Sequence, residues 1–142
     1  MNTYFETSAI MKLVVSEEGS DAAGAVWDGS DFLITSRLSY AEARAALAAA
    51  RRAKRLSEKE LQDAKTSLER RFQEIDLIEV TSEVARSAGD LAERHALRGY
   101  DAVHLASALA LDAESVVLVT WDRDLAQAGL IEGFDLAGIR VE

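Results

Sequence analysis

Residues 115–120 read SVVLVT, and this run is the segment that most constrains the fold of the chain. A continuous apolar, β-branched run of this length is typical of a central strand in a parallel sheet, because such a strand is covered on both faces. Shorter runs of strand character lie at residues 2–6, 32–35 and 75–80, and DLAGIRV near the end of the sequence is predicted to form a last strand. Strands that alternate with helices predict an α/β fold with a central, mainly parallel sheet.

Two helices between the second and third predicted strands are expected to form a hairpin over about residues 39–74. The first is alanine-rich and runs from Ser39 to about Arg55. The second begins at a capping box formed by Ser57 and Glu60, after which apolar residues recur at spacings of three and four. Periodic apolar residues indicate further helices after Ser8, around Val84 and from Asp101.

Composition restricts the classes of protein to which the chain can belong. A single domain over residues 1–142 suits this length, and the apolar share of 49% with a charged share of 29% is typical of globular proteins. No apolar run approaches the roughly 18 residues that a membrane span needs, and the first residues lack the pattern of an export signal. Cysteine is absent, which excludes disulfides and thiolate metal sites. We expect a cytoplasmic protein that does not bind membranes.

The overall charge argues against a general nucleic-acid-binding surface. Sixteen basic and 25 acidic residues give a formal net charge of −9, whereas phosphate binding draws most of its strength from Lys and Arg. One local exception is the run RRAKR, in which the candidate contacts to RNA are Arg51, Arg52, Lys54 and Arg55. Cations at the C-terminal end of a helix are also stabilised by the helix dipole, so the run has a purely structural explanation as well.

Four acidic residues at strand ends and helix starts are the candidate functional residues. Glu6 ends the first predicted strand, and Asp122 follows the central run SVVLVT in the same way. The carboxyl ends of parallel strands meet at one edge of a sheet, where the sites of such folds lie. Asp101 opens a predicted helix, and Glu42 lies one turn into another. Taken singly, Asp101 also suits a helix cap, Asp122 a turn and Glu42 a solvated helix surface.

A cluster of these carboxylates would be a metal site. Converging carboxylates repel one another and raise one another's pKa unless a cation joins them. Sites that offer only oxygen ligands suit hard ions such as Mg²⁺ or Mn²⁺. Two such ions about 4 Å apart can activate a water and stabilise the oxygen that leaves a phosphodiester. The predicted chemistry is therefore hydrolysis without a protein nucleophile.

Four segments of the sequence resemble the motifs of one known family. The segments are TYFETSAIMKLVVSEEGS, SYAEARAAL, GYDAVHLASAL and LVTWDRDLAQAG. Their order and approximate spacing resemble those of the motifs in PIN-domain ribonucleases, especially the VapC-like toxins of toxin–antitoxin modules. The resemblance covers nearly the whole chain and implies a single PIN-like domain, a doubly wound α/β/α sandwich. It also implies a Mg²⁺-dependent endoribonuclease, an RNA substrate, a small VapB-like antitoxin as partner, and a homodimer; Mn²⁺ is a candidate substitute ion because the ligands are oxygens.

The resemblance also assigns roles to individual residues. Matched motif by motif, the catalytic and metal-binding acids are Glu6, Glu42, Asp101 and Asp122. Ser8 and Thr120 are implied as nearby hydroxyls that support the site. Asp124 is a further candidate, although the sequence DRD is equally typical of a polar turn. His104 lies three residues after Asp101 on the same predicted helix, so it either faces the site or is packed and hydrogen-bonded in the core.

One position departs from the family pattern. The first acid of the family is normally Asp, whereas this chain has Glu6. The additional methylene moves the carboxylate by roughly 1.5 Å, the length of one carbon–carbon bond, and a misplacement of about 1 Å in a preorganised site can cost on the order of a hundredfold in rate. The alternative function is therefore a catalytically impaired PIN-like binding module that keeps antitoxin or RNA binding.

Overall fold

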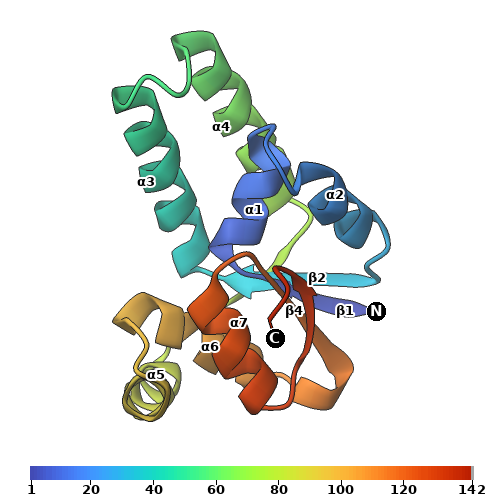
Figure 1. Cartoon of the computed structure of the whole chain (residues 1–142), viewed down its shortest axis with the longest axis vertical. Helices are drawn as coiled ribbons and strands as arrows, with labels where there is room; N and C mark the ends of the chain where they lie inside the picture. The colour runs from blue at the N-terminus through green and yellow to red at the C-terminus, as the bar shows by residue number, and fades with distance from the viewer. Residues whose placement is uncertain (142) are drawn as a thin grey trace.

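The computed structural model describes residues 1–141 and contains a five-stranded sheet in the order β3-β2-β1-β4-β5, with every neighbouring pair parallel (Figure 1). The strands are β1 Asn2–Phe5, β2 Phe32–Ser36, β3 Asp76–Ile78, β4 Val116–Thr120 and β5 Asp135–Gly138. From β1 the chain builds one half of the sheet through β2 and β3, then returns to build the other half through β4 and β5. The strand order therefore reverses between β1 and β4, which makes their carboxyl ends the expected place for a site.

Helices cover both faces of this sheet (Figure 1). They are α1 Thr7–Val14, α2 Ser20–Asp28, α3 Leu38–Arg52, α4 Glu58–Phe72, α5 Ser82–His95, α6 Gly99–Leu109 and α7 Arg123–Ile131, with a short 3-10 helix at Ala113–Ser115. Side chains alternate along β1, because successive residues of a strand point to opposite faces. Tyr4 lies in a core with α5, α6 and α7, whereas Phe5 lies in a second core with α1 to α4. This arrangement confirms the predicted α/β/α sandwich.

The predicted hairpin is formed by α3 and α4, which extend away from the sheet at the top of Figure 1. Ser57 and Glu60 form the expected capping box, in which each side chain accepts a hydrogen bond from the backbone N–H of the other residue. Leu47 of α3 and Leu68 of α4 are both fully buried in the core shared with α1. The hairpin is therefore anchored at its base, and its far end carries the turn at residues 53–57.

Some elements differ from the predictions. Helix α2 was not predicted, because its N-cap is Gly19 and no side chain marks its start. Helix α7 was not predicted either, because its N-cap Asp122 was considered only as a site acid or a turn residue. Strand β3 is shorter than residues 75–80, and β5 ends at Gly138, whose positive φ of 111° turns the chain out of the sheet.

Within residues 1–141, no helix combines the length and apolar character needed to cross a bilayer.

Candidate functional site

The structure brings the predicted acids to the carboxyl edge of the sheet. Glu6 follows β1 directly, and Asp122 lies two residues beyond the end of β4. Asp101 lies in the first turn of α6, and Glu42 lies on α3. Asp101 is close enough to Asp122 and Glu6 for their negative charges to act on it. Three acids therefore share one region, and Glu42 borders it through a separate set of contacts.

Glu6 is held by two hydroxyl groups. Its side chain is buried, with 5% of the residue exposed, and Oε2 accepts a hydrogen bond of 2.7 Å from Thr120 Oγ1 and another from the Ser8 hydroxyl. Ser8 Oγ in turn accepts from the N–H of Trp121 at 2.8 Å, and Thr120 Oγ1 accepts from the N–H of Asp122 at 3.0 Å. These bonds join the start of α1 to the loop that follows β4, and so they fix the Glu6 carboxylate relative to Asp122.

Glu42 is held by a buried chain of hydrogen bonds that crosses the sheet edge. Its Oε1 accepts from Thr7 Oγ1 at 2.7 Å and lies 2.5 Å from Nε2 of His104. Because the Thr7 hydrogen is directed to Glu42, both atoms that face Nε2 are acceptors, and Nε2 therefore carries a hydrogen. Nδ1 of His104 forms a bond of 2.8 Å with the Tyr4 hydroxyl. His104 is fully buried, so it is packed and hydrogen-bonded and also touches a site acid.

The same contacts decide the charge of Glu42. Partial burial acts to raise its pKa and is the largest single influence, but the hydrogen bonds and charge of His104 and the bond from Thr7 outweigh it, so the pKa lies below its ordinary value. Tyr4 behaves in the opposite way. Complete burial, together with the charges of Glu6 and Glu42, raises the pKa of its phenol far above the usual range despite opposing hydrogen bonds. At neutral pH Glu42 is ionised and Tyr4 is protonated.

Asp101 and Asp122 share one arginine. Arg98 Nε donates to Asp101 Oδ2 at 3.1 Å, and a terminal nitrogen of the same guanidinium lies 3.7 Å from Asp122 Oδ2. Burial raises the pKa of Asp101; the hydrogen bond and charge of Arg98 oppose this effect, and the charges of Asp122 and Glu6 add to it, with a raised value as the result. Asp122 also caps α7, because its Oδ1 accepts from the N–H of Leu125 at 2.9 Å.

Asp101 makes no capping hydrogen bond, although it lies in the first turn of α6, where the helix dipole favours a carboxylate. Helix α6 begins at Gly99 with Arg98 as its N-cap residue, and no side chain makes a capping bond there. Asp101 bonds to Arg98 instead of to the backbone at the start of the helix. The contact with Arg98 and the position in the first turn both bear on Asp101.

The oxygen atoms of the four acids and their neighbours are of the kind that binds a hard cation. In this structure the acidic side chains contact other side chains instead. Within the described residues, no group of three or more His, Cys, Asp or Glu side chains is arranged to hold a metal ion. Hydroxyls hold Glu6, His104 and Thr7 hold Glu42, and Arg98 spans Asp101 and Asp122. The ligands on offer are carboxylate and hydroxyl oxygens, which are the ligands that Mg²⁺ and Mn²⁺ prefer.

Other predicted residues lie outside this cluster. Asp124 is exposed in the first turn of α7 and lines a hollow of about 450 Å³ with residues of α5, such as Arg94. The basic run lies at the far end of the hairpin, where Arg51 pairs with Glu58 at 3.4 Å. Sequence reasoning missed Arg98 and Thr7. The spacing of three residues between Arg98 and Asp101 was a usable signal, whereas the contact of Thr7 with Glu42 depends on the packing of α1 against α3.

The three-layer fold and this acidic sheet edge define the class of the protein. The chain belongs to the PIN domain family, whose family model matches residues 3–130. Among individual proteins, it is 49% identical over 138 residues to ribonuclease VapC45 of Mycobacterium tuberculosis, covering 97% of this chain and 92% of that protein.

Solved structures show the same fold. The crystal structure of VapC20 from Mycobacterium tuberculosis, a toxin that cleaves the sarcin–ricin loop, matches with a TM-score of 0.69 and 18% identity, covering 90% of this chain and 95% of that one. VapBC-5, a member of the VapBC family of toxin–antitoxin systems from the same organism, matches with a TM-score of 0.62 and 19% identity, covering 99% of this chain and 98% of that one.

Proposed function

We propose that this protein is the toxin component of a toxin–antitoxin system and acts as a metal-dependent endoribonuclease that cleaves RNA phosphodiester bonds. The observation that carries the proposal is the meeting of Glu6, Asp101 and Asp122 at the carboxyl edge of a parallel sheet, where Thr120 links Glu6 to Asp122 and Arg98 links Asp122 to Asp101. The 49% identity with ribonuclease VapC45 supports the choice of RNA as substrate. The catalytic residues are Glu6, Asp101 and Asp122, with Glu42 beside them.

The proposed cofactor is Mg²⁺, with Mn²⁺ as a substitute, and the same four acids would hold it. When bound, such an ion supplies the positive charge that activates water and stabilises the negative charge that develops on the phosphodiester. Ser8 and Thr120 keep the Glu6 carboxylate in place through their hydrogen bonds. Glu42 is ionised at neutral pH, so it can accept a hydrogen bond from the attacking water and orient it.

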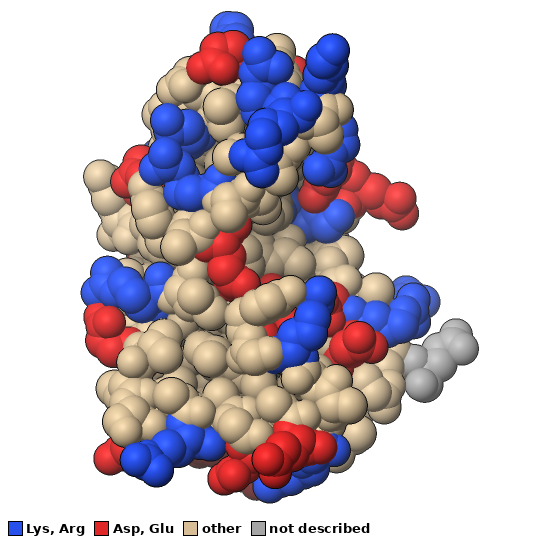
Figure 2. Space-filling view, turned by 90° about the vertical axis from the view of Figure 1, so that its left-hand side faces the viewer, with Lys and Arg blue, Asp and Glu red and all other residues tan. Residues whose placement is uncertain are grey.

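The RNA is proposed to extend from the acids towards the hairpin end. Figure 2 shows Lys and Arg side chains gathered over the end of the hairpin, with Asp and Glu side chains further down the same face. Arg52, Lys54 and Arg55 are exposed there, and Arg51 is half-buried. Ten residues of α3 separate Glu42 from Arg52, so these regions lie about 15 Å apart along the helix at 1.5 Å per residue. Phosphates beyond the cleaved bond are the proposed ligands of these cations.

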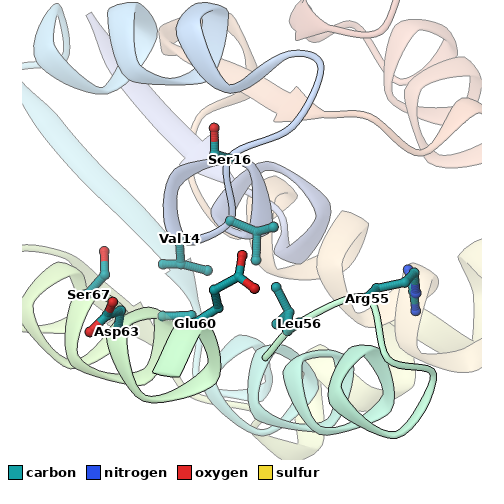
Figure 3. A pocket seen from close by; sticks show the side chains of 9 residues that line it. Val14, Ser16, Arg55, Leu56, Glu60, Asp63 and Ser67 are labelled. Atoms are coloured by element: carbon teal, nitrogen blue, oxygen red, sulfur yellow. The ribbon is translucent and has the colours of Figure 1, made fainter. Parts of the chain in front are cut away.

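A small antitoxin is the proposed protein partner. Two adjoining hollows, of about 390 and 530 Å³, run along the end of α1 and the inner side of the hairpin, and Val15 and Leu56 line both. Figure 3 shows the smaller hollow between Val14 and Ser16 of the α1 end and Glu60 and Asp63 of α4; the site acids are not among its lining residues.

The larger hollow is lined by alanines of α3, and these give the antitoxin a surface that it can approach closely. Ala46 and Ala49 face this hollow, and Ala46 lies one turn beyond Glu42 on the same side of α3. A partner segment along this surface could therefore direct a basic residue to the acids, where it would compete with the metal. We further propose a cytoplasmic homodimer, as in the toxins that the sequence resembles.

The second candidate function is a PIN-like binding module with impaired catalysis, and Glu6 is the observation that favours it. The longer side chain reaches both Ser8 and Thr120 from its buried position. An Asp at the same position would be shorter by about 1.5 Å, so the structure has accommodated Glu6 with contacts that an Asp would change. Such a module would still bind the antitoxin or RNA but would cleave RNA slowly or not at all.

Cleavage of RNA by the wild-type protein and by Glu6→Asp, each with Mg²⁺ and with a chelator, separates the two functions. We expect Mg²⁺-dependent cleavage that rises in Glu6→Asp, by up to about a hundredfold if the extra methylene misplaces the carboxylate. Asp122→Asn is expected to abolish it, and Glu83→Asp on the exposed first turn of α5 should change nothing. If neither protein cleaves RNA but both bind the antitoxin from the neighbouring reading frame, the binding module is the correct function.

A further inference from the structure

Arg98 is placed where a site cation would be expected. Within residues 1–141 it is the one Lys or Arg that forms an ion pair with any of the four acids, and it contacts two of them. The two carboxylates come from different elements, since Asp101 belongs to α6 and Asp122 precedes α7. One guanidinium therefore joins two parts of the site that metal ligands would also join.

Helix capping does not explain an arginine at this position. Arg98 is the N-cap residue of α6, a position at which Ser, Thr, Asp and Asn are strongly preferred because their side chains accept backbone hydrogen bonds. Arginine has no acceptor, and α6 has no side-chain capping bond. From this position the Arg98 side chain can contact both Asp101 and Asp122.

The surroundings of Arg98 leave it free to move. Its side chain is 65% exposed, whereas that of Asp101 is 7% exposed and that of Asp122 is 25% exposed. The guanidinium carbon lies 4.9 Å from the ring centroid of Tyr100, which is itself 44% exposed at the surface. A guanidinium over an aromatic ring is stabilised there without giving up its hydrogen-bond donors. Arg98 thus has a second favourable contact that does not depend on the acids.

We propose that Arg98 exchanges partners during the reaction: it neutralises Asp101 and Asp122 until a divalent cation takes these carboxylates, and it then stays over Tyr100 and holds a phosphate of the RNA. This inference rests on the proposed function and assigns Arg98 as its substrate-positioning residue. The exchange follows from charge, because a bound divalent cation would repel the guanidinium and compete with it for the same two carboxylates. Phosphate is the natural replacement, since it matches the planar fork of an arginine.

The exchange makes a prediction in two parts. Metal must displace Arg98, so removal of the arginine strengthens metal binding. RNA gains Arg98 as a ligand, so the same removal weakens RNA binding in the presence of metal. In the wild-type protein metal and RNA therefore strengthen each other's binding, and this coupling is reciprocal. A residue with a purely structural role would not move the two affinities in opposite directions.

Calorimetric titration with Mn²⁺, in the absence of RNA, tests the first part on the full chain. Arg98→Ala is expected to bind Mn²⁺ about fivefold more tightly than the wild type, the size of effect that a partly exposed ion pair can have. Arg98→Lys should fall between the two. Arg94→Ala is the matched control, because Arg94 is similarly exposed and forms an ion pair with Glu132; its affinity should equal that of the wild type. Unchanged or weaker Mn²⁺ binding by Arg98→Ala would overturn the proposal.

The second part is measured with a 2′-O-methyl RNA oligonucleotide at saturating Mn²⁺. We expect Arg98→Ala to bind the oligonucleotide several-fold more weakly than Arg94→Ala, a variant that carries the same change of net charge. Equal RNA affinities of these two variants would overturn the exchange. Neither measurement depends on cleavage. If the wild-type protein cleaves RNA but Arg98→Ala shows neither effect, the inference about Arg98 is wrong and the proposed function stands. If Arg98→Ala shows both effects but the wild-type protein does not cleave RNA, the proposed ribonuclease activity is wrong instead.

Discussion

At the scale of single residues, Asp101 is the site acid whose charge the fold opposes. Burial, followed by the charges of Asp122 and Glu6, raises its pKa even though Arg98 donates to it. A carboxyl group whose folded pKa is raised binds its proton more tightly in the folded than in the unfolded state. Its contribution to stability is therefore lost as the pH rises from the ordinary value of 3.8 through the raised value. Above both values the folded state carries the full cost of the charge.

Asp101→Asn is accordingly expected to stabilise the protein at neutral pH. The variant removes the buried charge that the folded state opposes, so the melting temperature should rise above that of the wild type. The measurement is thermal unfolding in a chelator at pH 7 and at pH 3, because the gain should vanish where both states are protonated. Asp90→Asn on the exposed face of α5 is the control. A gain of equal size at both pH values would contradict the explanation by charge.

The sequence allowed the acids and the hydroxyls of Ser8 and Thr120 beside Glu6 to be predicted, but not the contacts that hold Glu42. Glu6 and Asp122 follow apolar strands, and this local pattern is enough to indicate the edge of a sheet. The bond between Thr7 and Glu42 joins residues 35 positions apart, and that between Tyr4 and His104 joins residues 100 apart. No local pattern encodes such pairs, because they depend on how α1, α3 and α6 pack against the sheet.

At the scale of elements, the end of β5 packs against the end of β4, whose last residue Thr120 bonds to Glu6. Gly138 lies opposite Thr120 in the register of β4 and β5, with a φ of 111°. A Cβ at Gly138 would lie 2.1 Å from the carbonyl oxygen of Thr120, which already accepts a hydrogen bond from Ile139. Glycine is therefore needed at position 138 both for its positive φ and because a Cβ would clash with the backbone of Thr120, the residue whose hydroxyl binds Glu6.

Gly138→Ala should therefore destabilise the protein more than a change of conformation alone would explain. Gly133 is the matched control, because it also has a positive φ, of 99°, but a Cβ at this position would have no neighbouring atom within 4 Å. An alanine in this backbone conformation costs about 1–2 kcal/mol, so Gly133→Ala should lose that amount and Gly138→Ala at least about twice as much. Urea unfolding measures both. Equal losses would show that the contact with Thr120 is relieved at little cost.

The elements that sequence reasoning predicted are those with a strong local signal. The hairpin has a capping box and long apolar periodicity, and β4 has an unbroken apolar run. Helix α2 has no such local signal, since a glycine precedes it. It is held in place by the packing of Trp27 against Phe5, with ring centroids 5.3 Å apart. The hydrophobic pattern of such a short helix is completed only by a partner from another part of the chain.

At the scale of the whole molecule, the distribution of charge matters more than its sum. The chain carries a net charge of −9, yet several of its Lys and Arg side chains gather over the hairpin end (Figure 2). An RNA strand would be attracted by these cations at the hairpin end and, through a bound metal, at the sheet edge. Net charge therefore says little about whether such a protein binds RNA.

The hairpin end provides the test of this arrangement. Replacing Arg52 and Lys54 by Gln should weaken RNA binding and reduce its dependence on salt, because each phosphate contact that is lost lowers the slope of log affinity against log salt by about 0.7 for a single strand. The slope should fall by about 1.4 for the double variant. Arg70 and Arg140, two exposed cations elsewhere, replaced by Gln in the same way, give a control of equal net charge. Binding is measured with a non-cleavable RNA oligonucleotide across a range of KCl concentrations at fixed Mg²⁺. If both double variants change the slope equally, the RNA is attracted by net charge alone and does not follow α3 to the hairpin end.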